Sequence, residues 1–256
     1  MPMKALDLIV KESIAVSASA VRLVLTAPVN DPLPELAPGQ FVEVRIDDTP
    51  GALLRRPISI HDCCSAAGSV TLLVQRVGKG TKWLCNRREG DVVNVVLPLG
   101  KGFSLTPTEK PLLVGGGVGV APLLYLGKEL MRRGCEPTFL LGARTENDLL
   151  CLERFEQAGR TLVCTENGGA GEKGFVTQHS VLDKEIFSRI YACGPMPMMK
   201  AVANVARAKG IPCEVSLENR MACGLGACLC CVEDTVDGNV CVCKEGPVFD
   251  IDRLKW

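Results

Sequence analysis

Residues 112–122 read Leu-Leu-Val-Gly-Gly-Gly-Val-Gly-Val-Ala-Pro, which is a short apolar run, four glycines within five positions, and a proline. This order predicts a buried strand, a glycine-rich turn and the start of a helix. In such a turn the backbone can approach a pyrophosphate, and the N–H groups of the helix face the anion. We therefore predict that Gly115, Gly116, Gly117 and Gly119 form part of a dinucleotide site. The pattern departs from strict G-x-G-x-x-G, and close packing is an alternative reason for these glycines.

The sequence around this turn alternates strands with helices. Further strands are predicted at 138–141, 161–165 and 190–193, and helices follow up to about residues 133, 158 and 209. Such alternation predicts a parallel sheet with right-handed crossovers. Cys193, Gly194 and Pro195 follow the last of these strands, so they are expected at the same carboxyl edge as the glycine turn. Cys193 then lies beside the nicotinamide, or it is simply a small buried residue before a turn.

The first hundred residues follow a different pattern, in which six short β-rich runs are separated by turn signals such as Pro38-Gly39 and Glu89-Gly90-Asp91. Six strands without a long helix predict a small antiparallel barrel. A linker is expected at about residues 104–110. The predicted strands cover residues 6–16, 21–25, 41–46, 57–60, 70–77 and 92–97.

Two short motifs lie inside this predicted barrel. Arg56-Pro57-Ile58-Ser59 offers an arginine that suits a phosphate and a serine that can hydrogen-bond a flavin ring nitrogen. The turn Gly78-Lys79-Gly80-Thr81 leads into a helix and can hold a second phosphate. An arginine on a strand is more commonly solvated or salt-bridged, so the motif is informative only because a nucleotide domain follows it.

The composition of the chain argues against several classes of function. The 29 basic residues balance 29 acidic ones, which gives no net field for nucleic acid or an anionic membrane. The apolar stretch 111–127 is interrupted by glycines and Pro122, and the charged amino terminus does not resemble a signal peptide. We expect a cytoplasmic protein with reduced thiols.

The two histidines, His61 and His179, fit no triad spacing, so no catalytic side chain is predicted and the chemistry is assigned to cofactors.

Cysteines concentrate near the end of the chain, where seven of the 14 lie between Cys213 and Cys243. Cys223, Cys228 and Cys231 have the spacing C-x4-C-x2-C, which opens plant-type [2Fe–2S] sites, and a fourth cysteine must come from further on. Gly224 and Gly226 let the loop backbone direct N–H groups at the inorganic sulfides. A structural zinc site is the alternative, although Cys241-x-Cys243 is tighter than the usual zinc pair.

The order of barrel, nucleotide domain and cysteine loop resembles the ferredoxin-reductase superfamily, and within it the electron transfer subunits of class 1B dihydroorotate dehydrogenases. The resemblance covers essentially the whole chain, and its most specific part runs from Leu217 to Cys231 and continues in Cys243-Lys-Glu-Gly-Pro-Val-Phe249. It implies a multi-domain fold that combines all-β and α/β parts. We divide it into a flavin-binding β-barrel (1–104), a parallel-sheet NAD-binding domain (105–211) and an iron–sulfur segment (212–256).

The resemblance also assigns residues. The four cluster ligands fall on Cys223, Cys228, Cys231 and Cys243, the last because it precedes the Gly-Pro-Val-Phe run, which leaves Cys230 and Cys241 as non-ligands. The superfamily prefers R-x-Y-S, so Ile58 removes any aromatic stacking on the flavin from that position. The contacts implied for FAD fall on Arg56, Pro57, Ile58, Ser59, Leu73, Val74, Gln75, Gly80 and Thr81.

By the same resemblance, a partner subunit that carries FMN oxidises dihydroorotate, and this chain passes the electrons through [2Fe–2S] and FAD to NAD+ in pyrimidine biosynthesis. A heterotetramer with two copies of each chain is implied. The resemblance favours NAD over NADP, although Arg144 after the second strand of the nucleotide domain can meet either coenzyme. The rivals are a reductase subunit of a sulfide dehydrogenase, ferredoxin:NADP+ reductase or hydrogenase, and a non-enzymatic scaffold protein stabilised by zinc.

Overall fold

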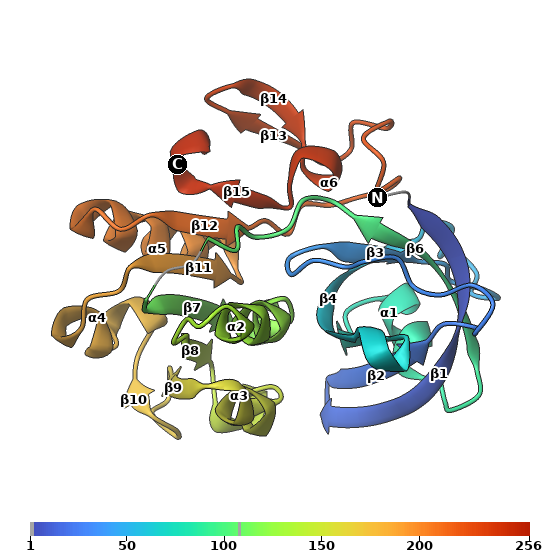
Figure 1. Cartoon of the computed structure of the whole chain (residues 1–256), viewed down its shortest axis with the longest axis horizontal. Coiled ribbons are helices and arrows are strands. Elements are labelled where there is room, and N and C mark those ends of the chain that lie inside the picture. Colours follow the sequence, from blue (N-terminus) through green and yellow to red (C-terminus); the bar gives the residue numbers. More distant parts are fainter. Residues whose placement is uncertain (1–2, 107–108) are drawn as a thin grey trace. The chain divides into compact units, whose positions relative to one another are not determined.

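The computed structural model describes residues 3–106 and 109–256, so the predicted linker at about 104–110 includes two residues outside the described part. The chain forms two compact units (Figure 1), each of which is described by itself. The first comprises Met1–Gly102, Asn219–Glu233 and Val240–Pro247. The second comprises Phe103–Glu218, Asp234–Asn239 and Val248–Trp256.

The first unit is built on a closed antiparallel barrel, which confirms the predicted architecture. Its strand order is β1-β2-β5-β4-β3-β6. Side chains alternate between the two faces, so that Val93, Val95 and Leu97 of one strand are fully buried while their neighbours are more exposed. The strands are β1 (Lys4–Ser17), β2 (Ala20–Thr26), β3 (Phe41–Val44), β4 (Arg56–Cys64), β5 (Ser69–Gln75) and β6 (Val92–Leu99).

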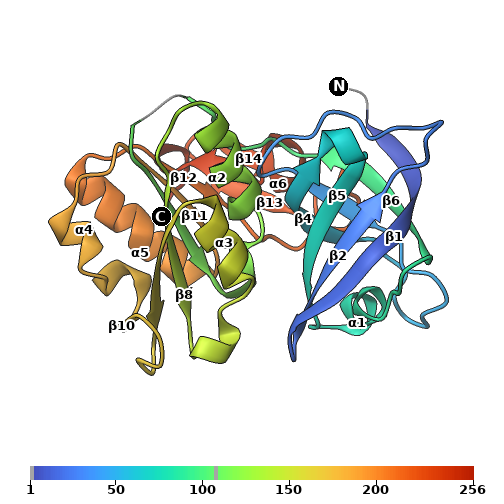
Figure 2. The same cartoon turned by 60° about the horizontal axis from the view of Figure 1, so that its bottom comes forward.

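One short helix, α1 (Lys79–Cys85), packs against β5 and β2 of the barrel, as Figure 2 shows. The cysteine-rich part of this unit has little regular structure. It consists of the loop 219–231, residues 232–233, residues 240–241 and the helix α6 (Val242–Glu245). Residues 232–233 begin the strand β13 (Val232–Thr235) and residues 240–241 end the strand β14 (Gly238–Cys241), which pair with each other; the residues between belong to the second unit. A sequence with so many glycines and cysteines favours such loops over long elements.

The second unit holds a seven-stranded sheet in the order β10-β9-β8-β7-β11-β12-β15. All its strand pairs are parallel except β12 with β15, which confirms the predicted parallel sheet. Three short strands that the sequence did not predict extend it, β10 at one edge and β12 and β15 at the other. The strands are β7 (Pro111–Gly116), β8 (Thr138–Ala143), β9 (Arg160–Thr165), β10 (Glu172–Lys173), β11 (Arg189–Cys193), β12 (Cys213–Ser216) and β15 (Val248–Asp250).

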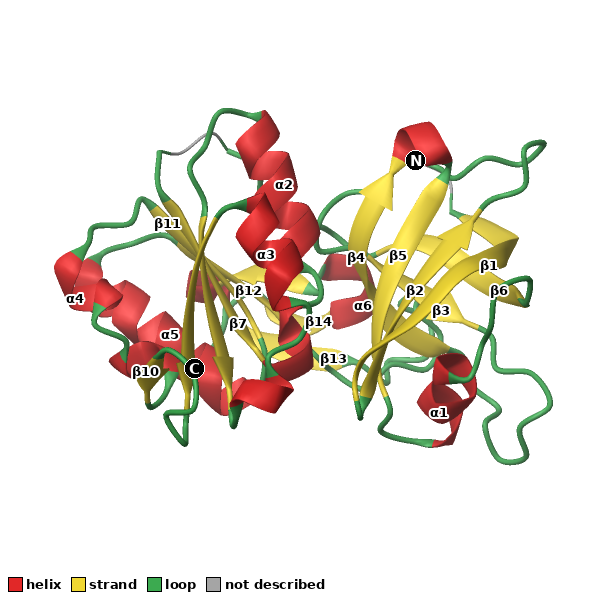
Figure 3. Ribbon diagram, turned by 90° about the horizontal axis from the view of Figure 1, so that it is seen from below, coloured by secondary structure: helices red, strands yellow, loops and turns green. Residues whose placement is uncertain are grey.

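Helices cover both faces of this sheet, as the view in Figure 3 shows. Helices α2 (Leu123–Arg132) and α3 (Leu152–Ala158) lie on one face, and α4 (Val181–Lys184) and α5 (Met196–Lys209) lie on the other. Phe139 of β8 is fully buried and packs edge-on against Phe155 of α3, with ring centroids 5.1 Å apart. None of the helices in the described part of the chain has both the length and the apolarity needed to span a membrane.

Candidate cofactor sites

The predicted cluster ligands lie in the first unit, three of them on the loop 219–231 and Cys243 on α6. We call these two segments together the cysteine loop. Backbone N–H groups already point at three of the four sulfur atoms. Leu225 donates to Cys223 Sγ at 3.3 Å, Gly226 donates to Cys243 Sγ at 3.1 Å, and the N–H of Cys243 donates to Cys231 Sγ at 3.4 Å. Such donors stabilise thiolates, and thiolates are the form of cysteine that binds iron.

Positive φ angles shape this loop. Gly224 (φ 68°) and Gly226 (φ 79°) adopt the left-handed conformation that glycine accepts without strain. Leu229 also has a positive φ (58°), which costs a residue with a side chain on the order of 1 kcal/mol. Strain of this kind is typical of segments whose shape serves a site.

Hydrogen bonding and burial act on the thiols in opposite directions. The backbone N–H of Leu225, assisted by groups of Cys228 and Ala227, lowers the pKa of Cys223 to about 6. Burial raises the pKa of the Cys243 thiol to about 12. Cys231 and Cys243 are buried, whereas Cys228 is exposed. The loop therefore offers one ready thiolate at Cys223, whereas a cluster must displace the proton of the buried Cys243 thiol.

The arrangement of the thiols fits a two-iron cluster. The N–H of Cys243 donates to Cys231 Sγ, and the charges of Cys231 and Cys223 both act on the Cys243 thiol, so these groups lie close to one another. Within residues 3–106 and 109–256, no three His, Cys, Asp or Glu side chains converge as ligands of one metal ion. All four predicted ligands are thiols, which is the donor set of plant-type [2Fe–2S] sites. The Cys241 thiol instead faces the carbonyl oxygen of Gly226 at 3.7 Å.

The residues predicted to contact FAD line a split in the barrel. Strands β4 and β5 pair only from Ile60–Leu72 to Cys64–Ser69. Beyond that point Arg56–Ser59 pair with β3, and Leu73–Gln75 pair with β2. The facing edges of β4 and β5 therefore separate, and the backbone groups of Arg56–Ser59 do not pair with those of Leu73–Gln75. Free strand edges next to the start of α1 are suited to an extended ligand with polar rings and phosphates.

Arg56, Gly80 and Thr81 lie together at this split. A Cβ atom on Gly80 would lie 2.6 Å from Arg56 Nε, so the arginine side chain packs directly on the backbone of Gly80. Thr81 Oγ1 accepts hydrogen bonds from the N–H groups of Val77 and Gly78 at 2.9 and 3.0 Å. Sequence analysis did not predict this role of Thr81, which shapes the turn before α1.

In the second unit, the glycine turn and the Cys-Gly-Pro turn meet at the carboxyl edge of the sheet. Cys193 pairs with Gly115 across β11 and β7. Strands β8 and β11 flank β7 on opposite sides, so this edge is the topological switch point where such sheets bind ligands. Cys193 is buried, and burial raises the pKa of its thiol. Arg144 follows β8 directly and is exposed.

The glycines of this turn have different roles. A Cβ on Gly119 would lie 2.4 Å from Gly194 Cα, and one on Gly116 would lie 2.5 Å from Met198 Sδ. A Cβ on Gly115 would meet Val120 at 2.8 Å, so these three glycines serve close packing. Gly117 differs, because it has φ 55° and open space around its Cβ position. Gly117 is therefore the member of the set with room for a ligand.

Gly119→Ala should destabilise the protein, because the new methyl group would overlap the Gly194 backbone. Overpacking of this kind costs about 1–3 kcal/mol, which corresponds to a fall in Tm of roughly 3–10 °C. Gly117→Ala is the matched variant, and its strained φ should cost only about 1 kcal/mol. Calorimetry of both variants checks this expectation. A Gly119→Ala protein as stable as the wild type would contradict the packing role.

Three family models match the chain. Residues 7–103 match an oxidoreductase FAD-binding domain, residues 113–204 match an oxidoreductase NAD-binding domain, and residues 218–255 match the iron–sulfur cluster binding domain of dihydroorotate dehydrogenase B. The three matched segments follow one another in the order that the sequence predicted. The chain thus contains FAD-, NAD- and iron–sulfur-binding domains.

Curated relatives match over most of the chain. The electron transfer subunit of dihydroorotate dehydrogenase B (NAD(+)) from Fusobacterium nucleatum is 41% identical over 83% of this chain and 84% of its own length. The protein of the same name from Desulforamulus reducens is 42% identical, over 86% and 87% respectively. A solved structure of an NADH-dependent reduced ferredoxin-NADP oxidoreductase has a TM-score of 0.86 and 34% identity, and the match covers 100% of this chain and 92% of that one.

Proposed function

Because the chain belongs to the family of dihydroorotate dehydrogenase B electron transfer subunits, we propose that its catalytic partner is an FMN-containing dihydroorotate dehydrogenase. The chain itself is an oxidoreductase subunit that transfers electrons to NAD+. The observation that carries the proposal is the set of predicted ligand thiols, three of which accept backbone N–H groups, within the segment that matches the family's own iron–sulfur domain. We place the complex in the cytoplasm.

We assign the cofactors to three segments, with FAD in residues 1–104, NAD in 105–211 and the cluster in 212–256. Bound FAD converts between the single electrons of an iron–sulfur cluster and the electron pair of nicotinamide. Cys223, Cys228, Cys231 and Cys243 hold the cluster through their thiolates. Arg56 and the edges of β4 and β5 hold FAD, while Gly117 and the turn Cys193-Gly194-Pro195 line the dinucleotide site.

The surface of the cysteine loop supports docking of the catalytic subunit. Leu225 is 50% exposed and Leu229 is 65% exposed, and they lie on either side of the ligand Cys228. Exposed leucines in a strained loop are costly unless another protein covers them. We propose that the partner packs against these side chains, which brings its FMN within electron-transfer range of the cluster. The complex is then a heterotetramer of two copies of each chain.

Leu229→Asp should weaken this complex, because a carboxylate would be buried against the partner. A charge at the centre of an interface costs about 2 kcal/mol or more, which corresponds to a loss of affinity of at least roughly 30-fold. Co-purification from native cells and size-exclusion chromatography measure the effect. Val29→Asp is the control, since Val29 is 96% exposed on a barrel loop and the loop carries no cluster ligand.

A partner that is not a dihydroorotate dehydrogenase would favour a second candidate function. The match to the NADH-dependent reduced ferredoxin-NADP oxidoreductase supports a reductase subunit of such a complex as that alternative. The two candidates share every cofactor site and differ in the partner. Mass spectrometry of the proteins that co-elute with the wild-type chain, and are lost with Leu229→Asp, separates them.

A further inference from the structure

Glu43 carries a buried carboxyl group that none of the assigned cofactor contacts uses. It lies in the middle of β3, where Val42 and Val44 are fully buried and Glu43 is 1% exposed. Alternation along a strand places Glu43 on the face opposite to its two neighbours. Within the described residues, neither carboxyl oxygen of Glu43 has a hydrogen-bond partner.

The cysteine loop covers this carboxyl group. A Cβ atom on Gly224 would lie 2.8 Å from Glu43 Cγ and 3.1 Å from Glu43 Oε1. Gly224 directly follows the proposed cluster ligand Cys223. The backbone of the loop therefore rests on the Glu43 side chain, and any side chain at position 224 would force the two apart.

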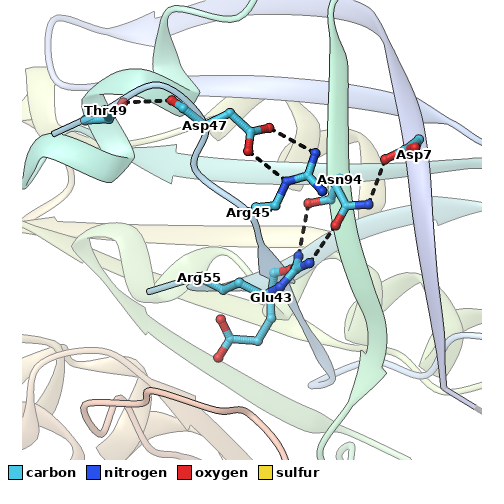
Figure 4. Close-up of polar contacts among 7 residues, drawn as sticks. All are labelled: Asp7, Glu43, Arg45, Asp47, Thr49, Arg55 and Asn94. Carbon is cyan, nitrogen blue, oxygen red and sulfur yellow. Dashed lines mark hydrogen bonds and ion pairs between the residues drawn. The ribbon is translucent and has the colours of Figure 1, made fainter. Parts of the chain in front are cut away.

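Arg55 is the cation that acts most strongly on the Glu43 carboxyl group, but its hydrogen bonds go to other groups. Arg55 donates to the backbone oxygen of Glu43 at 3.1 Å and to Asn94 Oδ1 at 2.6 Å. Figure 4 shows that the Glu43 carboxyl group points away from this network. Burial raises the pKa of Glu43 to about 7, against the lowering effects of Arg55 and Arg56, while Cys223 adds to the rise. These three are the charged or titratable groups that act on the Glu43 carboxyl group.

A buried carboxyl group without hydrogen bonds works against folding stability. Proteins retain buried carboxyl groups of this kind at functional sites, where they lower folding stability but serve the function. A negative charge close to a cluster opposes reduction, because each electron adds one more negative charge to the same low-dielectric region. Glu43 packs against the cysteine loop, so its negative charge lies where it can oppose reduction of the cluster.

We propose that the Glu43 carboxylate, packed against the cysteine loop, lowers the reduction potential of the [2Fe–2S] cluster through its negative charge. The inference rests on the proposed ligands Cys223, Cys228, Cys231 and Cys243. One electron enters the cluster during reduction, and Glu43 itself gains and loses none. A lower potential favours passing the electron onward to the flavin over retaining it.

The test is a redox titration of the intact complex, monitored by the electron paramagnetic resonance signal of the reduced cluster. At about pH 8.5, above the pKa of Glu43, Glu43→Gln should make reduction about tenfold more favourable, a positive shift of about 59 mV for a one-electron couple. Glu43→Asp should move the potential back toward the wild-type value. Glu89→Gln is the control that removes the same charge elsewhere, since Glu89 is exposed in the turn that precedes β6.

Each other outcome has a definite meaning. Equal potentials for Glu43→Gln and the wild type would overturn the inference while the cluster assignment stands. A Glu43→Gln protein without a cluster would also overturn it, because Glu43 would then be needed to build the loop. A wild-type protein without the [2Fe–2S] signal would overturn the cluster assignment, and the inference would fall with it.

Discussion

Cys243→Ala is expected to abolish the iron–sulfur cluster, whereas Cys241→Ala should leave it in place. Cys243 is buried, its sulfur receives a backbone N–H at 3.1 Å, and its own backbone N–H donates to Cys231 Sγ at 3.4 Å. Loss of an outer hydrogen-bonding partner already lowers metal affinity about 10–100-fold, so loss of a ligand should cost at least about 100-fold. Iron and sulfide analysis, together with the visible spectrum after anaerobic purification, measures the result.

The comparison with Cys241 makes this test specific. Cys241 lies two residues away, and its thiol faces the carbonyl oxygen of Gly226 instead of a sulfur. Both variants remove one thiol from the same short segment, so a general disturbance of the loop would affect them alike. Retention of the cluster in Cys243→Ala with loss in Cys241→Ala would move the fourth ligand to Cys241.

Arg56→Gln should weaken FAD binding by roughly 10–100-fold. A hydrogen bond to a charged group contributes about 1.5–3 kcal/mol, and each 1.4 kcal/mol is a factor of ten in affinity. The glutamine keeps a polar side chain beside Gly80 but loses the positive charge that we propose binds the flavin phosphates. Flavin fluorescence during titration of the apoprotein gives the dissociation constant.

Arg45→Gln is the matched control for this variant. Arg45 is an exposed arginine of the same barrel, and its guanidinium pairs with Asp47 at 2.8 Å. An exposed pair of this kind contributes at most about 1 kcal/mol, so FAD affinity should not change. Equal losses in the two variants would show that net charge, and not the position of Arg56, governs flavin binding.

The barrel was predictable because local sequence signals determine it. All six strands occur in the structure close to the predicted ranges, since alternation of apolar residues and turn signals are local properties. Strands β12 and β15 were not predicted. They contain four and three residues, and β12 pairs with β11 while β15 pairs with β12, which are long-range contacts that a short window does not contain.

The roles of the individual glycines in the turn and the burial of Glu43 also could not be predicted from local sequence. The sequence identified the four glycines but did not separate Gly117, which has open space, from the three that pack against protein atoms. Glu43 alternates with Val42 and Val44, which predicts a solvated position on the outer face of the strand. It is buried because a loop from the other end of the sequence covers it. The four ligand positions, by contrast, followed from spacing and family resemblance, and they remain predictions until cluster content is measured.

The most direct test of the central claim is anaerobic affinity purification of this chain from its native cells, followed by an assay of dihydroorotate-dependent NAD+ reduction. We expect an FMN-containing catalytic subunit to co-elute in equal amounts, and NAD+ reduction to require both chains. A chain that elutes with a different oxidoreductase and gives no dihydroorotate-dependent NAD+ reduction would contradict the assignment.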